Sequence, residues 1–264
     1  MKKIISYFAA AALIAGLMTT AAFADDTAEV YVTIANGELV MTQQAVELTD
    51  ADDDGQLTIN DALYLAHEEA FEGGAAAGYG SAETEWGLSL TKLWGVENGG
   101  SYGYYVNNAS AMGLKDPVKD GDYINAFVYT DTTAFSDVYC FFDKESAAVI
   151  SGEEFTLTLS AAAFDENWAP ITKPVADAVV TVNGQETSYK TDADGKVTLK
   201  VEGTDKAVIS AKSASATLVP PACTVYVSEK APQTSDIAAV SAVLVSAVAM
   251  LGTGYAASAK KNND

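Results

Sequence analysis

The segment from Asp50 to Asp61 carries oxygen-bearing side chains at a spacing that suits a divalent cation. It runs Asp-Ala-Asp-Asp-Asp-Gly-Gln-Leu-Thr-Ile-Asn-Asp. Calcium takes six to eight oxygen ligands, and a loop that wraps it needs glycine at the sixth of its twelve positions, which here is Gly55. The predicted ligands stand at positions one, three, five, seven (through its backbone carbonyl), nine (through a water) and twelve: Asp50, Asp52, Asp54, Gln56, Thr58 and Asp61.

This loop resembles the calcium loops of dockerins and other bacterial EF-hand segments, in which aspartate at position twelve is normal. The resemblance implies calcium as cofactor, bound in the range of about 10⁻⁴–10⁻³ M that is typical of extracellular modules. A dockerin has two such segments and this chain has one, so no cohesin partner is expected. The alternative is an acidic turn in which Asn60 or Asp61 caps the following helix.

Aromatic residues between positions 86 and 105 are the candidates for contact with a ligand. Tryptophan and tyrosine rings stack on sugars and flat molecules, and a cluster of them would form a binding face. The alternative is that half of these rings belong to the core. The four candidates are Trp86, Trp94, Tyr104 and Tyr105.

Catalytic machinery is not evident in the sequence. His67 is the only histidine and lies within a predicted helix, and there is no G-x-S-x-G motif. Acidic residues are numerous, but no pair of them stands out as a glycosidase pair. We therefore expect a protein that is not an enzyme.

The first 24 residues have the features of a signal peptide. Lys2 and Lys3 precede an apolar stretch from Ile4 to Met18, and Ala22-Phe23-Ala24 provides an A-x-A cleavage site. Cleavage after Ala24 would leave a mature chain that starts outside the cytoplasm.

A second apolar segment, 237–259, is long enough to span a membrane, and the tail 260–264 begins with two lysines that would remain in the cytoplasm. Residues 230–236 precede it and contain Pro232 and Thr234. This arrangement resembles the LPxTG cell-wall sorting signal of Gram-positive bacteria, with Ala231 and Ser235 in place of leucine and glycine. The resemblance implies attachment to peptidoglycan through Thr234, and the alternative is a plain membrane anchor.

Charge excludes one class of partner. Lys2, Lys3, Lys260, Lys261 and Asp264 belong to the two terminal segments. The rest of the chain has 11 lysines against 35 acidic residues, a net charge of −24, and it has no arginine. Such a surface repels phosphate backbones, so no nucleic-acid partner is expected.

Cys140 and Cys223 are the only cysteines; they are either a disulfide or two separate buried thiols.

The first half of the mature chain shows strand and helix periods in turn. Val30, Val32 and Ile34 alternate with polar residues, Asn36-Gly37 marks a hairpin, and 39–48 is the returning strand. Apolar positions from 59 to 70 follow a helical period that Gly73-Gly74 ends, and 75–81 is expected to be a loop. Further strands are predicted over 102–106, 123–129 and 138–142.

One stretch runs from Trp86 through Leu93-Trp94-Gly95 and Tyr104-Tyr105-Val106 to Asp120-Gly121-Asp122. It resembles the β-grasp-like domain shared with the C-terminal part of transcobalamin and intrinsic factor. Surface proteins of Gram-positive bacteria also carry this domain. The resemblance implies a β-grasp-like domain over 25–146. In the vitamin carriers it helps to enclose cobalamin, together with a helical barrel that this chain lacks.

The second half alternates throughout and has turn signals at Asn183-Gly184 and at Asp192 to Gly195. The stretches 175–182 and 191–199 resemble bacterial immunoglobulin-like repeats of the invasin or carboxypeptidase-regulatory type. This resemblance implies a β-sandwich over 147–229, acting as a spacer or an adhesive module.

The sequence therefore predicts a mainly β protein with one or two helices: a signal peptide over 1–24, two domains, and a C-terminal anchor. Its predicted function is that of a calcium-stabilised, non-catalytic binding or adhesion protein, displayed on the outer face of a Gram-positive cell. The ligand would be an extracellular glycan or protein. The alternatives are capture of cobalamin or a related nutrient, and a purely structural wall protein.

Overall fold

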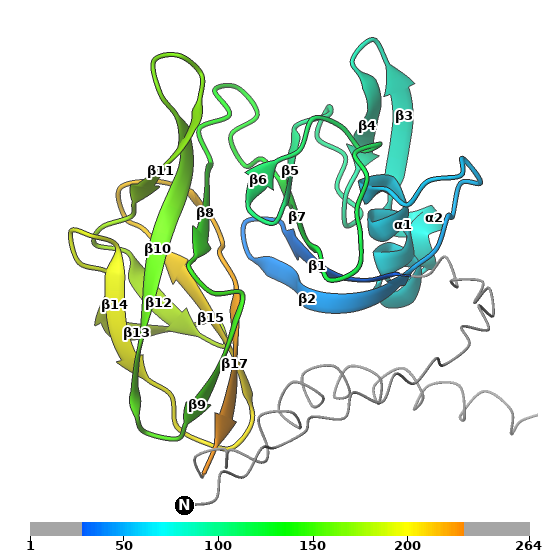
Figure 1. The fold of residues 1–264 in the computed structure, drawn as a ribbon. Helices are drawn as coiled ribbons and strands as arrows, with labels where there is room; N and C mark the ends of the chain where they lie inside the picture. Colours follow the sequence, from blue (N-terminus) through cyan, green and yellow to red (C-terminus); the bar gives the residue numbers. More distant parts are fainter. Residues whose placement is uncertain (1–27, 230–264) are drawn as a thin grey trace, which may run out of the picture.

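The computed structural model describes residues 28–229, which form two β-rich units side by side (Figure 1). The described chain is mainly β, with two helices, as the sequence predicts. The cleavage site at Ala24, the sorting motif with Pro232 and Thr234, and the apolar segment 237–259 lie outside the described residues. Among residues 28–229, no helix has the length and apolar character needed to cross a membrane.

The first unit is a mixed five-stranded sheet in the order β2-β1-β7-β5-β6. Its central strands β1 and β7 are parallel, and the other pairs are antiparallel. The predicted hairpin is confirmed, since β1 and β2 are joined at Asn36-Gly37. The strands are β1 (Ala28–Ala35), β2 (Leu39–Leu48), β5 (Tyr102–Val106), β6 (Ala109–Ser110) and β7 (Tyr123–Val128).

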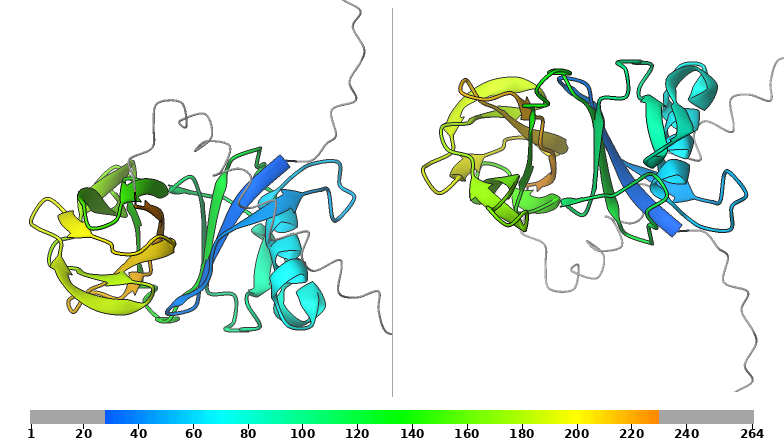
Figure 2. Two further views of the ribbon diagram at one scale, coloured as in Figure 1. Left: turned by 90° about the horizontal axis from the view of Figure 1, so that it is seen from below. Right: turned by 90° about the horizontal axis from the view of Figure 1, so that it is seen from above.

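Helix α1 (Ile59–Ala70) covers one face of this sheet, as Figure 2 shows. Its predicted bounds are confirmed, because the apolar positions Ile59, Leu63 and Ala66 share one face and are fully buried against the sheet. The predicted loop 75–81 is wrong in part. It contains a short helix, α2 (Gly74–Gly78), and leads directly into the hairpin of β3 (Gly80–Thr84) and β4 (Gly87–Lys92).

The second unit consists of two sheets packed face to face. One has the order β11-β10-β8-β16, with β14 also paired to β10, and the other has the order β13-β12-β15-β17-β9. Alternating residues of both sheets, such as Leu157, Val180 and Ile209, meet in one buried cluster. The strands are β8 (Val138–Phe142), β9 (Ser146–Ile150), β10 (Glu154–Phe164), β11 (Pro170–Pro174), β12 (Val179–Val182), β13 (Gln185–Lys190), β14 (Lys196–Lys200), β15 (Lys206–Lys212), β16 (Leu218–Val219) and β17 (Cys223–Ser228).

The strand pairing places the boundary between the two units earlier in the chain than the sequence predicts. The sequence assigns 25–146 to the first domain, but β8 pairs with β10 and β16, and β9 pairs with β17. Both strands therefore belong to the second unit, and the division lies in the segment 129–137. The alternation of apolar and polar residues within β8 indicates that one face of the strand is buried. It does not indicate which sheet supplies the neighbouring strand.

The two cysteines are separate buried thiols, as one of the two sequence interpretations expects. The Cys140 Sγ donates to the Val219 carbonyl oxygen at 3.2 Å, and Cys223 is fully buried in β17. Burial raises the pKa of each thiol to about 12, so both remain protonated and unreactive at neutral pH.

Candidate functional site

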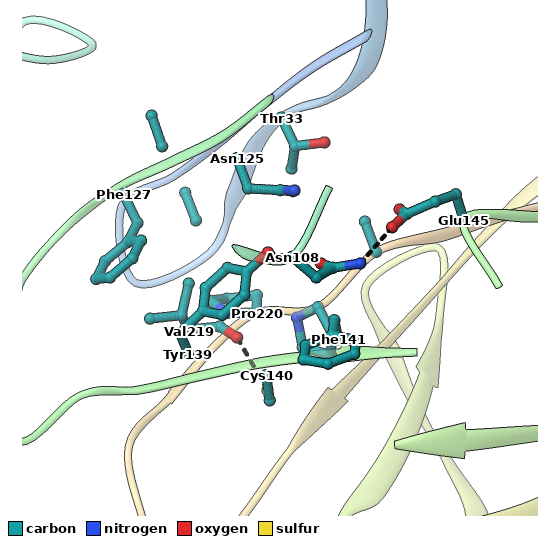
Figure 3. A pocket seen from close by; sticks show the side chains of 14 residues that line it. Thr33, Asn108, Asn125, Phe127, Tyr139, Cys140, Phe141, Glu145, Val219 and Pro220 are labelled. Atoms are coloured by element: carbon teal, nitrogen blue, oxygen red, sulfur yellow. Dashed lines mark hydrogen bonds between the residues drawn. The ribbon is translucent and has the colours of Figure 1, made fainter. Parts of the chain in front are cut away.

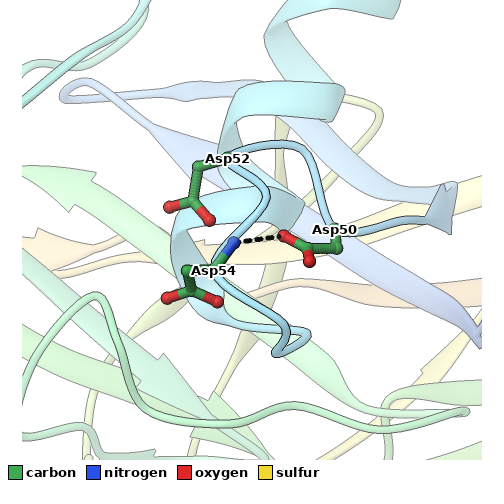
Figure 4. A group of neighbouring side chains, drawn as sticks. All are labelled: Asp50, Asp52 and Asp54. Carbon is green, nitrogen blue, oxygen red and sulfur yellow. Dashed lines mark hydrogen bonds between the residues drawn. The ribbon is translucent and has the colours of Figure 1, made fainter.

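Three of the predicted calcium ligands lie together in the loop before α1. One carboxylate oxygen from each of Asp50, Asp52 and Asp54 falls within 4.8 Å of the others (Figure 4). Asp50 shapes the loop, because its carboxylate accepts hydrogen bonds from the backbone N–H of Asp54 at 3.1 Å and of Gly55 at 2.8 Å. Gly55 has φ of +84°, the left-handed conformation that the tight turn requires.

Asp61 closes the loop from the helix side. It is fully buried, and its Oδ1 accepts from the backbone N–H of Ala51 at 2.9 Å. Its Oδ2 accepts from the Thr58 backbone N–H at 2.9 Å and from the Thr58 hydroxyl at 2.7 Å. The carboxylate at position twelve therefore ties the first residues of the loop to the start of α1.

Thr58 has a different role from the predicted one. It is the N-cap of α1, and it forms a reciprocal capping box with Asp61. Only 1% of Thr58 is exposed, and its hydroxyl donates to Asp61, so it does not face the loop as a holder of a bound water. The alternative that Asn60 or Asp61 caps the helix is correct only in part: the cap is Thr58, and Asp61 takes part as the third helical residue, whose carboxylate accepts from the Thr58 backbone N–H. Gln56, whose backbone carbonyl was the predicted ligand at position seven, has an exposed side chain in the loop.

The loop concentrates negative charge. Desolvation and the neighbouring charges of Asp61 and Asp54 raise the pKa of Asp52. Its Oδ2 accepts one hydrogen bond, from the Asn60 amide at 3.0 Å. Carboxylates held this close repel one another, and a bound divalent cation would remove that repulsion.

The four predicted ligand-contacting aromatics do not form one face. Trp86 is 84% exposed in the turn between β3 and β4, whereas Trp94 packs edge-on against Phe71 beside α1. Tyr104 and Tyr105 are neighbours on β5, so their rings point to opposite faces of the sheet. Tyr104 packs on the core beneath α1, and Tyr105 packs on the junction with the second unit.

Other aromatic residues are exposed in turns and were not predicted. Phe135 lies between β7 and β8, and Phe164 and Trp168 lie at the turn between β10 and β11. Trp168 is 82% exposed and has φ of +62°, an unusual conformation for a bulky residue. The sequence signal for this turn is the run Asp165-Glu166-Asn167, a polar cluster between alternating segments.

His67 has a structural role. It is fully buried, its Nδ1 lies 2.6 Å from the Leu63 carbonyl oxygen, and its Nε2 accepts from the Trp94 backbone N–H at 3.0 Å. Nδ1 therefore carries the proton. Burial lowers the pKa of the ring, against the opposing effect of the Leu63 carbonyl.

A cleft of about 970 Å³ separates the β1–β2 turn from the second unit. Its walls are largely small and hydroxyl-bearing residues, with Glu38 and Lys212 as charged groups. The lining also includes apolar residues such as Leu39, Val208 and Leu218, so it offers both hydrogen bonds and apolar contact to a ligand.

Comparisons with known proteins do not show a family for this chain. No protein-family description matches the sequence, and no curated protein matches it. Among solved structures, the N-terminal Ig1-2 module of the Drosophila receptor protein tyrosine phosphatase DLAR is 18% identical, covers 56% of this chain and 74% of its own, and has a TM-score of 0.24. The D0-D1 domain of intimin is 17% identical over 57% of this chain and 80% of its own, with a TM-score of 0.27. At such TM-scores we draw no functional argument from these likenesses.

Proposed function

We propose that this chain is a non-catalytic surface binding or adhesion protein that contacts an extracellular partner through aromatic turns at one end of the molecule. The observation that carries the proposal is the exposure of Trp86 and Trp168, at 84% and 82%. Tryptophan is enriched among the residues that contribute most to binding at protein interfaces.

The placement of these turns supports display away from a surface. In Figure 1 the β3–β4 turn, the β10–β11 turn and the segment between β7 and β8 extend toward the upper end, whereas β17 ends at the lower end. The predicted anchor follows β17 in the sequence. An anchor at that end would place the aromatic turns farthest from the cell.

Within this proposal the first unit is β-grasp-like and the second is immunoglobulin-like. The β1–β2 hairpin, the helix that follows it, and the parallel central strands β1 and β7 support the first assignment. The two packed sheets support the second. Because the four aromatic candidates of the first unit lie apart, cobalamin capture gains no support from the described residues.

Calcium is the proposed structural cofactor, held by Asp50, Asp52 and Asp54. Their hard oxygen donors suit calcium, and the tight turn at Gly55 suits a loop that encloses it. Binding would lower the repulsion in the loop and stabilise the junction between β2 and α1, because Asp61 already ties both ends of the loop together.

The test is binding of the purified chain to immobilised mucin, before and after enzymatic removal of its glycans. Trp86→Ala and Trp168→Ala are each expected to weaken binding by at least tenfold, since they remove exposed contact rings. Met112→Ala, which removes a 91% exposed side chain from another loop, is the control. Loss of binding on deglycosylation identifies a glycan partner. Binding that both tryptophan variants retain in full would contradict the proposal.

A further inference from the structure

A hydroxyl and a carboxamide meet at the junction between the two units. The Thr224 hydroxyl of β17 donates to the Gln43 Oε1 of β2 at 2.5 Å, across 181 residues of chain. A carbonyl bond is about 1.23 Å long, so the Thr224 oxygen lies within about 3.7 Å of the Gln43 carbonyl carbon. This is close to the separation at which two groups can react.

The backbone of β2 aims Gln43 at this position. The register between β1 and β2 shifts opposite Thr33, and Gln43 has φ of +43°, in the left-handed region. Its backbone N–H donates to the Thr33 hydroxyl at 3.1 Å instead of to a ladder carbonyl. A bulge of this kind redirects a side chain and is over-represented next to reactive sites.

A carboxylate lies against the departing end of the amide. The Glu145 Oε2 is 3.3 Å from the Gln43 Nε2, and the Glu145 backbone carbonyl accepts from the same nitrogen at 2.8 Å. The Glu145 backbone carbonyl also accepts from the Thr224 N–H at 3.0 Å, which fixes Thr224 beside Glu145. Asn108 orients the carboxylate through a 2.6 Å bond to its Oε1 (Figure 3).

The junction is partly shielded from solvent, since Thr224 is buried and Gln43 and Glu145 are half-buried. Thr224 is 2% exposed. Glu145 borders a small cavity of about 10 Å³, which Thr33 and Asn125 also line (Figure 3). That volume is at the lower limit for one water molecule. Burial raises the pKa of Glu145, which favours a group that both accepts and donates a proton near neutral pH.

We propose that Thr224 and Gln43 form an intramolecular ester that joins the two units covalently. The Thr224 Oγ1 attacks the Gln43 Cδ, the C–N bond of the carboxamide breaks, and the nitrogen leaves as ammonia. The hydroxyl proton passes through the Glu145 carboxylate to the departing nitrogen. The reaction consumes one hydroxyl and one carboxamide, produces one ester and one ammonia, and requires no oxidant, reductant or other reactant.

The product would be a covalent clamp between β2 of the first unit and the last described strand of the second. Such a clamp would hold the two units at one angle when a displayed protein is pulled through its bound partner. It acts once in each molecule, so it is compatible with a protein that has no external substrate.

The experiment is mass spectrometry of the full purified chain under denaturing conditions. The expected mass is lower than that of its amino-acid sequence by one ammonia, about 17 Da. Proteolysis is expected to release one linked pair of peptides that contain Gln43 and Thr224, and alkaline hydroxylamine is expected to separate them. The linked pair distinguishes the ester from ammonia loss at an asparagine.

Variants locate the reaction. Thr224→Val removes the hydroxyl with little change of shape and is expected to restore the full mass, whereas Thr181→Val, at another buried threonine, keeps the loss. Glu145→Gln is expected to slow the appearance of the linked pair at least tenfold while the fold remains. A natural chain that retains its full mass, with no linked peptides after prolonged incubation, would overturn the proposal; the contact would then be a hydrogen bond alone.

Discussion

The ring of Tyr105 in the first unit stacks on the ring of Tyr139 in the second, with centroids 3.6 Å apart and planes within 5°. The Tyr139 hydroxyl also donates to the Asn108 Oδ1 at 2.8 Å. Tyr139 is buried in a small cluster with Phe127 and Val219, which lies between the cores of the two units. This stack gives the units a buried apolar contact beside the polar junction at Gln43.

Tyr139→Ala is expected to uncouple the two units. Loss of a buried aromatic ring costs about 3–5 kcal/mol, so thermal unfolding of the variant is expected to show two transitions where the natural protein shows one. Tyr139→Phe keeps the stack and loses one hydrogen bond, at a cost of about 0.5–1.5 kcal/mol. Differential scanning calorimetry distinguishes the cases, and a single unshifted transition in Tyr139→Ala would contradict the coupling.

Calcium is expected to raise the melting temperature through the loop at Asp50. At a calcium concentration of 100 times the Kd, the stabilisation is about 2.7 kcal/mol. Asp54→Asn removes one charged ligand and is expected to abolish the response. Asp194→Asn makes the same change of charge in a turn of the second unit and serves as the control. An equal response in both variants, measured with calcium and with chelator, would place the ion elsewhere.

Gly103 is expected to be essential to the packing of β5. A Cβ at this position would lie 2.2 Å from the Phe127 ring, which is 1% exposed and has no room to move. Gly103→Ala is therefore expected to destabilise the protein by at least about 1–3 kcal/mol. Gly113→Ala, where a Cβ would meet no atom within 4 Å, is the control. Urea unfolding measures both, and equal midpoints would show that this packing does not constrain β5.

His67 is expected to make stability fall at acid pH. Burial lowers its pKa in the folded protein, so below about 6.5 the unfolded chain binds more protons than the folded one. This contribution is present above that pH and is lost as the pH falls toward the folded pKa. The free energy of unfolding of His67→Gln, measured from pH 7.5 to 5, is expected to depend less steeply on pH. Parallel curves for the two proteins would exclude His67 as the source.

Quenching of tryptophan fluorescence by acrylamide is expected to distinguish the two exposed tryptophans from the packed one. Acrylamide is neutral, so the negative charge of the protein does not repel it. Trp86 and Trp168 are both more than 80% exposed and are expected to quench strongly. Trp94 packs on Phe71 and is expected to be shielded. Variants that retain one tryptophan each provide the measurement, and strong quenching of Trp94 would contradict its place beside α1.

Much of the local structure could be predicted because it depends on neighbouring residues. The apolar positions from Ile59 to Ala66 predicted α1, and Asn36-Gly37 predicted the turn between β1 and β2. The acidic spacing predicted that Asp50, Asp52 and Asp54 lie together; it also placed Asp61 with them, whereas the Asp61 carboxylate accepts from the backbone of Ala51 and Thr58. The part that Thr58 and Asp61 play in capping α1 was not predicted for that pair, because the calcium-loop spacing and the capping box assign different roles to the same residues.

Local sequence was enough to predict the mainly β class, the position of α1, and the acidic loop that precedes it. These follow from hydrophobic period, turn chemistry and ligand spacing, all of which act within about a dozen residues. The tertiary structure alone decided that β8 belongs to the second unit, that Tyr104 and Tyr105 serve two different cores, and that Gln43 meets Thr224. Strand pairing joins segments far apart in the chain, and alternation records only that a face is buried, never which partner buries it.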